Sequence, residues 1–165
     1  MKRCFGTLIG IILVLVMLSA SPSFAQRNAG GPFSALPGSW AGTGTITMSN
    51  GAKERIRCQG QYRLETRTSV RLQLDCASDS YRFELRSTTV AVNGGLSGTW
   101  SEQTRRVAGE ISGRIAGDRV NIRAEGQTFT ALLDMTTRGD RQSVSIRSPG
   151  SEMSQVSISL TRRSR

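Results

Sequence analysis

The sequence predicts an all-β protein, an up-and-down antiparallel β-barrel of about eight to ten strands with no significant helix in its mature part. Apolar and polar residues alternate almost without interruption from Trp40 onward, and this period of two is typical of strands with one buried face. Turn signals such as Asn50-Gly51 and Asn93-Gly94 separate the runs. So many consecutive hairpins require closure of the sheet, which removes its edges and buries one face.

Residues 1–25 have the layout of a secretory signal peptide. A basic start at Met1-Lys2-Arg3 precedes the uncharged run Phe5–Leu18, and small residues at Ser23 and Ala25 fit a cleavage site. The apolar run is shorter than the roughly 20 residues that span a bilayer. We therefore expect export to the periplasm or secretion, with no transmembrane anchor after processing; a retained anchor is the alternative.

Residues 26–38 are rich in Gly and Pro and show no periodicity, which predicts a flexible N-terminal arm. Residues 39–163 are then expected to form a single barrel domain. Loss of Lys2 and Arg3 with the signal lowers the net charge from +10 to +8. The remaining cations are arginines except for Lys53, and arginine suits phosphate or carboxylate recognition. A GC-rich genome is the alternative explanation for this bias.

The alternation divides this domain into ten expected strands joined by short loops. In the second strand, Ile56, Cys58 and Leu64 lie on one face, and arginine and glutamine on the other. The expected strands cover residues 39–48, 53–64, 69–77, 80–92, 95–101, 106–115, 119–126, 128–136, 142–148 and 154–162.

Two irregular features are expected within these strands. Val90 and Val92 break the parity set by Phe83 and Leu85, which predicts a bulge or bend between Arg86 and Val90. Glycine on the apolar face indicates places where another backbone comes close and the strands coil tightly. These positions are Gly42, Gly44, Gly60, Gly98, Gly109 and Gly113.

Cys58 and Cys76 are the two cysteines of the expected mature chain, and an even pair in an exported protein predicts a disulfide. Strand register leads to the same result. If Leu64 faces Val70, then Cys58 faces Cys76 and apolar residues oppose one another along the hairpin, whereas a slip of one residue would oppose apolar and charged positions. Two cysteines without histidine are too few ligands for a metal site, so no metal is expected.

The absence of histidine excludes a Ser-His-Asp triad, a Cys-His pair and a His-ligated zinc site. Carboxylates such as Asp75, Glu84 and Glu125 lie at outward positions among arginines, a pattern typical of surface ion pairs. No buried pair of acids of the kind that cleaves glycosides is visible. We therefore predict a protein that is not an enzyme and has no cofactor.

The candidate binding site is a row of arginines on the outer face. The same register places Arg63 beside Arg71, and extending it to the next hairpin places Arg71 opposite Arg86. Like charges directly opposed are unfavourable, and a bound anion would compensate them. We therefore predict anion binding by Arg63, Arg67, Arg71 and Arg86, with Arg67 contributed by the nearby loop. Solvated arginines at a splayed strand end are the alternative.

Gly38-Ser39-Trp40 resembles the G-x-W that begins the first strand of lipocalin-type barrels, and Leu96–Trp100 looks like a strand of avidin. This resemblance implies a lipocalin-like barrel, whose interior holds one small apolar ligand or is filled by side chains. Residues 76–83, 97–102 and 138–146 resemble segments of small exported β-rich proteins of alphaproteobacteria. That resemblance implies the compartment and the β-fold, and no activity.

Three functional hypotheses follow. The first is an exported barrel that binds an anionic or amphipathic envelope component, such as a lipid or glycan, at the arginine row or the barrel mouth. The second is a protease inhibitor that uses Arg27–Pro37, and the third is an envelope structural protein without a ligand. Nucleic acid is not an expected partner because of export and the lack of clustered aromatics. Few aromatics and repeated glycine on the apolar face also favour a soluble barrel over a membrane barrel.

Overall fold

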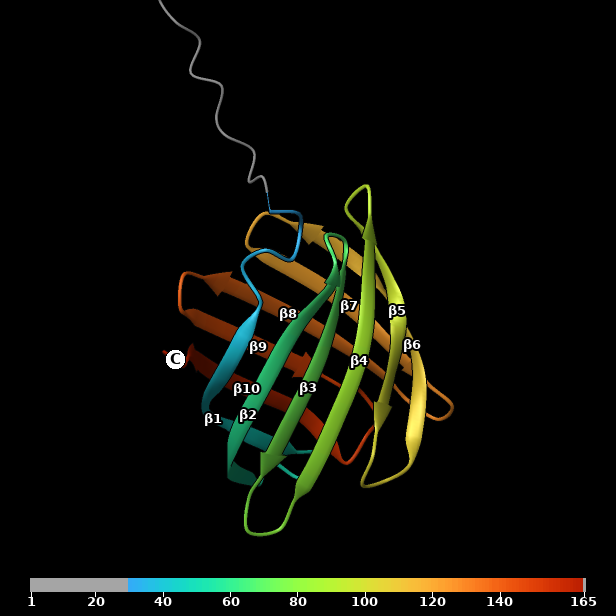
Figure 1. Ribbon diagram of the computed structural model, residues 1–165. Helices are drawn as coiled ribbons and strands as arrows, with labels where there is room; N and C mark the ends of the chain where they lie inside the picture. The colour runs from blue at the N-terminus through green and yellow to red at the C-terminus, as the bar shows by residue number, and fades with distance from the viewer. Residues whose placement is uncertain (1–29, 165) are drawn as a thin grey trace, which may run out of the picture.

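The computed structural model describes residues 30–164, in which ten strands close into one up-and-down antiparallel barrel (Figure 1). Each strand pairs with its neighbours in sequence, and β1 pairs with β10 to close the sheet. The strands are β1 (Gly38–Met48), β2 (Lys53–Thr66), β3 (Ser69–Ala77), β4 (Arg82–Val92), β5 (Gly95–Glu102), β6 (Val107–Ala116), β7 (Arg119–Gly126), β8 (Thr130–Arg138), β9 (Arg141–Arg147) and β10 (Met153–Arg162).

The predicted all-β barrel is therefore confirmed, and the ends of all ten expected strands agree with those of the structure to within two residues. The described part of the chain contains no helix long and apolar enough to cross a membrane. The expected signal peptide, residues 1–25, lies outside the described residues.

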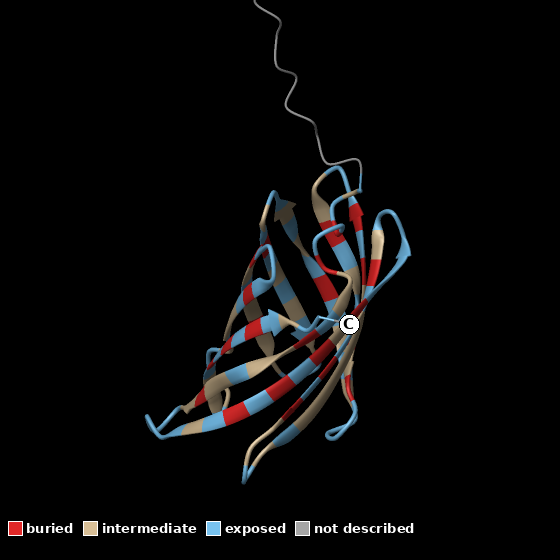
Figure 2. Ribbon diagram, turned by 60° about the vertical axis from the view of Figure 1, so that its left-hand side comes forward, coloured by how far each residue is buried: buried red, intermediate tan, exposed pale blue. Residues whose placement is uncertain are grey.

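Burial alternates along the strands, as Figure 2 shows by the succession of buried and exposed segments. In β2, Ile56, Cys58 and Tyr62 are buried, whereas Arg55 and Arg57 are exposed. Complete burial of a large aliphatic or aromatic side chain stabilises the fold by about 1.5–3 kcal/mol. A slip of one residue would bring every one of these side chains to the surface, so the apolar pattern fixes the parity of each strand.

The predicted disulfide is present between β2 and β3. Cys58 lies directly opposite Cys76, and their sulfurs are bonded across a sequence separation of 18 residues. Leu64 faces Val70 in the same hairpin, so the predicted register of β2 with β3 is also confirmed. Both cysteines are buried on the inner face of the barrel.

The predicted register of β3 with β4 is wrong by two residues, because Arg86 lies opposite Gln73 and not opposite Arg71. The turn between these strands is centred one residue later than expected. The N–H of Ser78 donates a hydrogen bond to the carbonyl of Tyr81 at 2.8 Å, so residues 79 and 80 form the tip of the turn in place of residues 78 and 79. A slip of two residues leaves every side chain on its face, and the alternation therefore could not reveal it.

The predicted bulge in β4 is also wrong, because this strand pairs without interruption with both of its neighbours. The inner face continues through Ser87, Thr89 and Ala91, and Val90 and Val92 lie on the outer face. The exposed fractions of the two valines are 37% and 65%. The change in the alternation therefore does not reflect a backbone bulge. In this part of β4, polar residues occupy inner positions and apolar residues occupy outer ones.

Glycines on the inner face mark close approaches of neighbouring backbones, as predicted. A Cβ on Gly109 would lie 1.7 Å from the carbonyl oxygen of Glu125, and one on Gly42 would lie 1.9 Å from that of Ser159. Gly60 is the exception, since the nearest atom to its Cβ would be 3.5 Å away. An added Cβ would also lie less than 2.5 Å from a neighbouring carbonyl oxygen at Gly44, Gly98 and Gly113.

Residues 30–37 close one end of the barrel, and we call this segment the plug (Figure 1). Phe33 and Leu36 are buried in the hydrophobic core, with exposed fractions of 2% and 5%. The structure thus differs from the flexible arm expected over residues 26–38. Two large apolar side chains in a segment otherwise made of glycine, proline and small residues suffice to anchor it, whereas residues 26–29 lie outside the described part.

Polar contacts fasten the plug to the barrel. The indole Nε1 of Trp40 donates a hydrogen bond of 2.9 Å to the carbonyl of Leu36. The guanidinium of Arg162, at the end of β10, donates hydrogen bonds to the carbonyls of Pro37 and Ala35. The plug is therefore held by both the first and the last strand.

Candidate functional site

A cavity of about 360 Å³ opens at the end of the barrel opposite the plug, and we call it the mouth cavity. Loops 78–81, 103–106 and 148–152 contribute to its rim. Its polar lining residues are Glu102, Arg105, Ser148, Ser151 and Glu152. Its apolar and aromatic lining residues are Tyr81, Phe83, Leu85, Trp100, Val107, Phe129, Ala131, Leu133, Ile146, Met153 and Val156.

A second, smaller cavity of about 130 Å³ lies deeper, beneath the plug, and we call it the inner cavity. Phe33 and Leu36 line it on the plug side, and Ile111 and Val120 are among the strand residues around it. Five side chains line both cavities and form the boundary between them. These are Phe83, Leu85, Trp100, Leu133 and Ile146.

Tyr62 and Gln142, two of the four polar residues that line the inner cavity, bond to each other; the other two are Ser87 and Thr89. The Tyr62 hydroxyl donates a hydrogen bond of 3.0 Å to Gln142 Oε1, and Gln142 Nε2 donates one of 3.0 Å to Thr137 Oγ1. Burial raises the pKa of Tyr62 to about 12, although the bond to Gln142 opposes this shift. The phenol is therefore neutral, and the inner cavity offers a ligand mainly apolar contact.

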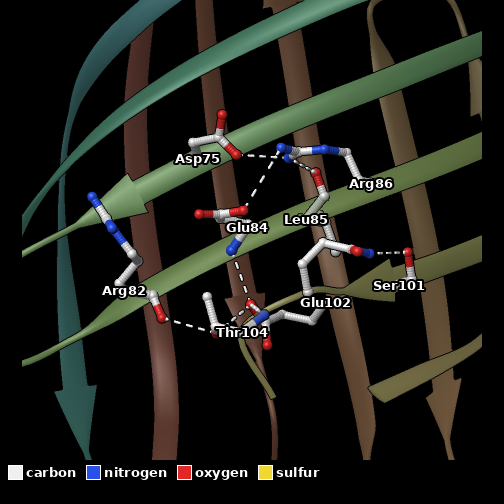
Figure 3. A network of polar contacts seen from close by, with 9 residues as sticks. Asp75, Arg82, Glu84, Leu85, Arg86, Ser101, Glu102 and Thr104 are labelled. Carbon is white, nitrogen blue, oxygen red and sulfur yellow. Dashed lines mark hydrogen bonds and ion pairs between the residues drawn. The ribbon is translucent and has the colours of Figure 1, made fainter. Parts of the chain in front are cut away.

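Glu102 is a buried carboxylate at the rim of the mouth cavity, with a side chain that is 9% exposed (Figure 3). It accepts hydrogen bonds from the backbone N–H groups of Glu84, Thr104 and Arg105 at 2.9, 3.1 and 2.7 Å. The Thr104 hydroxyl donates a fourth at 2.6 Å. Burial raises the pKa of Glu102, but these bonds outweigh burial and the net pKa is lowered. The carboxylate is thus occupied in holding loop 103–106.

Glu54 holds the neighbouring mouth loop in a similar way. Its Oε1 accepts a hydrogen bond of 2.9 Å from the backbone N–H of Ser80. Hydrogen bonds from the side chain of Ser78 and the backbone of Ser80 lower the pKa of this carboxyl. Two acids, one on β2 and one on β5, therefore fix loops at the open end of the barrel.

Arg105 supplies positive charge to the mouth cavity. Its side chain is 44% exposed, and its guanidinium lies 3.8 Å from Glu102 Oε2, longer than a hydrogen bond. Because Glu102 is already satisfied by backbone donors, the Arg105 guanidinium retains donors for an anionic group. Glu152 is the other charged residue that lines this rim.

The predicted arginine row does not form. Arg63 lies opposite Arg71, as expected, but Arg86 lies opposite Gln73 because of the shifted β3–β4 register. Arg71 and Arg86 still line one outer groove, which Arg63 and Arg67 do not reach. The structure therefore keeps the pair of Arg63 with Arg71 and the proximity of Arg71 to Arg86, but does not gather the four predicted residues in one site.

Each of these two arginines already has an acidic partner. Arg71 Nη2 lies 3.0 Å from Glu65 Oε2, and Arg86 Nη1 lies 2.6 Å from Asp75 Oδ1. The uncompensated charge that motivated the anion hypothesis is thus largely neutralised here. Anion binding on the outer face remains a prediction, and the mouth cavity is the stronger candidate.

Sequence reasoning missed Glu102 and Arg105 as parts of a site. The alternation of the sequence could have revealed Glu102. It follows Leu96 and Trp100 on the inner face of the same strand, where an acid is unexpected. Within residues 30–164 no group of three metal-ligating side chains comes together.

The described residues form a closed up-and-down antiparallel β-barrel with the plug at one end and the mouth cavity at the other. The structure is similar to the crystal structure of Rv2717c from M. tuberculosis, with a TM-score of 0.65 and 12% identity over 80% of this chain and 95% of that one. It is also similar to the S-type phycobiliprotein lyase CPES from Guillardia theta, with a TM-score of 0.54 and 11% identity over 81% and 91% of the two chains. At these identities the likeness shows the fold. No protein-family model and no curated protein matches the sequence.

Proposed function

We propose that the protein binds a small amphipathic molecule, with the apolar part of the ligand in the mouth cavity and its polar group at the rim. The supporting observation is the mouth cavity itself, whose volume of about 360 Å³ lies at the lower end of the range typical of ligand sites. Its walls are apolar except near the rim, and the plug blocks the opposite end. A closed β-barrel is a fold that can hold one small ligand in its interior, which agrees with such a role.

The proposed polar group is anionic. Arg105 has free donors at the rim, whereas the carboxylate of Glu102 is satisfied by four hydrogen bonds. A net charge of +8, expected after loss of the signal peptide, also attracts anions from a distance. This proposal keeps the hypothesis of an anionic or amphipathic envelope component, in the periplasm or outside the cell, and moves its site from the arginine row to the mouth.

We propose binding and not catalysis, because the one buried acid at the rim is committed to backbone donors. The protease-inhibitor hypothesis loses support, since residues 30–37 of the proposed inhibitory arm are tied to the barrel. A structural protein without a ligand is the remaining alternative, and it predicts no saturable binding.

Titration with anilinonaphthalene sulfonate, an anionic aromatic dye, tests the proposal. Ala131 lines the mouth cavity and Ala108 lies exposed on the outer face of β6, so Ala131→Trp and Ala108→Trp form a matched pair. We expect saturable binding to the wild type and to Ala108→Trp, and binding weaker by about tenfold or more to Ala131→Trp because the indole fills the cavity. Cooperative unfolding of each variant excludes dye uptake by a molten state.

The charge of the rim is tested separately. Arg105→Gln should weaken binding of the anionic dye and leave binding of the uncharged aminonaphthalene dye Prodan nearly unchanged. Glu152→Gln should not weaken the anionic dye. Equal affinity of the wild type and Ala131→Trp for both dyes would contradict the proposed function.

A further inference from the structure

The boundary between the two cavities contains one buried hydrogen-bond donor that has no partner in the described part of the chain. Trp100 lines both cavities and is 7% exposed, and its indole Nε1 is buried without a hydrogen-bond partner among the described residues. Trp40 provides the contrast, since its Nε1 donates to the carbonyl of Leu36 at 2.9 Å. A buried donor without a partner costs about 1–3 kcal/mol, so the observed position of Trp100 is less strongly held than that of Trp40.

Two glycines on the neighbouring strands make room for this indole. A Cβ on Gly109 would lie 2.9 Å from Trp100 Nε1, and one on Gly126 would lie 3.3 Å from its Cζ2. Gly109 and Gly126 face each other across β6 and β7, so they form one recess in the barrel wall. Phe129 packs against the ring with a centroid distance of 5.5 Å. The indole is thus retained by packing alone.

We infer that Trp100 is a movable divider and sets the depth of the binding site. This inference rests on the proposed function and names its ligand class: a molecule with one unbranched alkyl chain and an anionic head. The head contacts Arg105 at the rim, the chain displaces the indole, and the end of the chain enters the inner cavity. No hydrogen bond is lost when the ring moves, because Nε1 makes none.

The dimensions and chemistry of the interior favour this ligand class over a compact ring system. From Glu102 at the rim to Leu96 beside the inner cavity, β5 advances by six residue positions, or about 20 Å along the strand. Strand tilt shortens this to about 15 Å along the barrel axis. The two cavities, of about 360 and 130 Å³, are spread over this length, and the lining of the inner cavity is mainly apolar. An unbranched chain fits this shape.

Chain length is the variable that tests the inference. The affinities of octanoate, dodecanoate and hexadecanoate are measured by displacement of anilinonaphthalene sulfonate, with each fatty acid below its micellar concentration. Each methylene that leaves water contributes about 0.8 kcal/mol, so dodecanoate should bind at least about tenfold tighter than octanoate. Equal affinity of all three would overturn the inference and leave the proposed function intact, because dye binding reports the mouth cavity independently.

A variant whose inner cavity is blocked distinguishes two causes of tighter long-chain binding. One is entry of the chain into the inner cavity, and the other is the greater hydrophobicity of a longer ligand. Val120 lines the inner cavity and not the mouth cavity, whereas Val92 is exposed on the outer face. Val120→Phe should abolish the preference for long chains while retaining octanoate and dye binding, and Val92→Phe should behave as the wild type. Ile111→Phe blocks the same space from β6 if Val120→Phe does not fold. A long-chain preference that survives both inner substitutions would overturn the inference.

Tryptophan emission reports the divider directly, because Trp40 and Trp100 are the only tryptophans of the chain. Saturation with hexadecanoate should change the emission of the wild type, and octanoate should change it less. In Trp100→Phe the remaining Trp40 signal should not respond. An unchanged wild-type spectrum at saturating hexadecanoate would show that the chain does not reach Trp100.

Discussion

The guanidinium of Arg162 lies over the indole of Trp40, with its central carbon 4.3 Å from the ring centroid. This stacking joins the end of the last strand to the start of the first. The same guanidinium donates hydrogen bonds to the plug carbonyls of Pro37 and Ala35, and its Nε lies 3.0 Å from Asp140 Oδ1. One side chain therefore closes the sheet, fixes the plug and contacts the β8–β9 turn.

Replacement of Arg162 should weaken the barrel substantially. Arg162→Gln removes the cation–π contact and several charge-assisted hydrogen bonds, and we expect it to lower the free energy of unfolding by about 2–4 kcal/mol. Arg162→Lys keeps the charge but not the planar group, so it should recover only part of this loss. Urea denaturation measures both, with the exposed neighbour Arg163→Gln as the control. A change below about 0.5 kcal/mol for Arg162→Gln would contradict this assignment.

The plug should contribute to the core and not merely cover it. Phe33→Ala removes an aromatic side chain that is 2% exposed, and we expect a loss of about 3–4 kcal/mol in the free energy of unfolding. The adjacent residue Ser34 is exposed, so Ser34→Ala should change stability little. If both substitutions had equal small effects, the plug would be a loose attachment in solution.

The disulfide should stabilise the barrel mainly by lowering the conformational entropy of the unfolded chain. For a closed loop with a sequence separation of 18, the chain-entropy model gives about 3 kcal/mol at room temperature. The double variant Cys58→Ala with Cys76→Ala should lose about this amount in urea denaturation and retain the dye affinity of the wild type. An unchanged unfolding midpoint under reducing conditions would show that the bond is absent or without effect.

The parity of each strand could be predicted from the sequence, because burial of one face makes a slip of one residue costly. The Cys58–Cys76 pair added a second constraint to the β2–β3 hairpin, and its register was predicted correctly. No such constraint exists between β3 and β4. There a slip of two residues preserved both faces, and the predicted contact of Arg71 with Arg86 was lost with it.

The site itself was less predictable, because it depends on which side chains meet at one end of a closed barrel. Trp100 and Phe129 are 29 positions apart in sequence. Their rings come within 5.5 Å because the register of β5, β6 and β7 places Gly109 and Gly126, which have no side chains, beside them. The plug was missed because Phe33 and Leu36 are isolated apolar residues in a stretch without periodicity. Local pattern carries no information about such distant contacts.

The lowered pKa of Glu102 predicts a specific dependence of stability on pH. A carboxyl whose folded pKa is below its ordinary value, 4.5, stabilises the fold above that value, and this contribution is lost as the pH falls through the folded pKa. Glu102→Gln should therefore be less stable than the wild type at neutral pH, by about 1–3 kcal/mol, and the difference should shrink below pH 4.5. Urea denaturation across this range measures it, with the exposed Glu110→Gln as the control. A difference independent of pH would show that the charge of Glu102 does not hold loop 103–106.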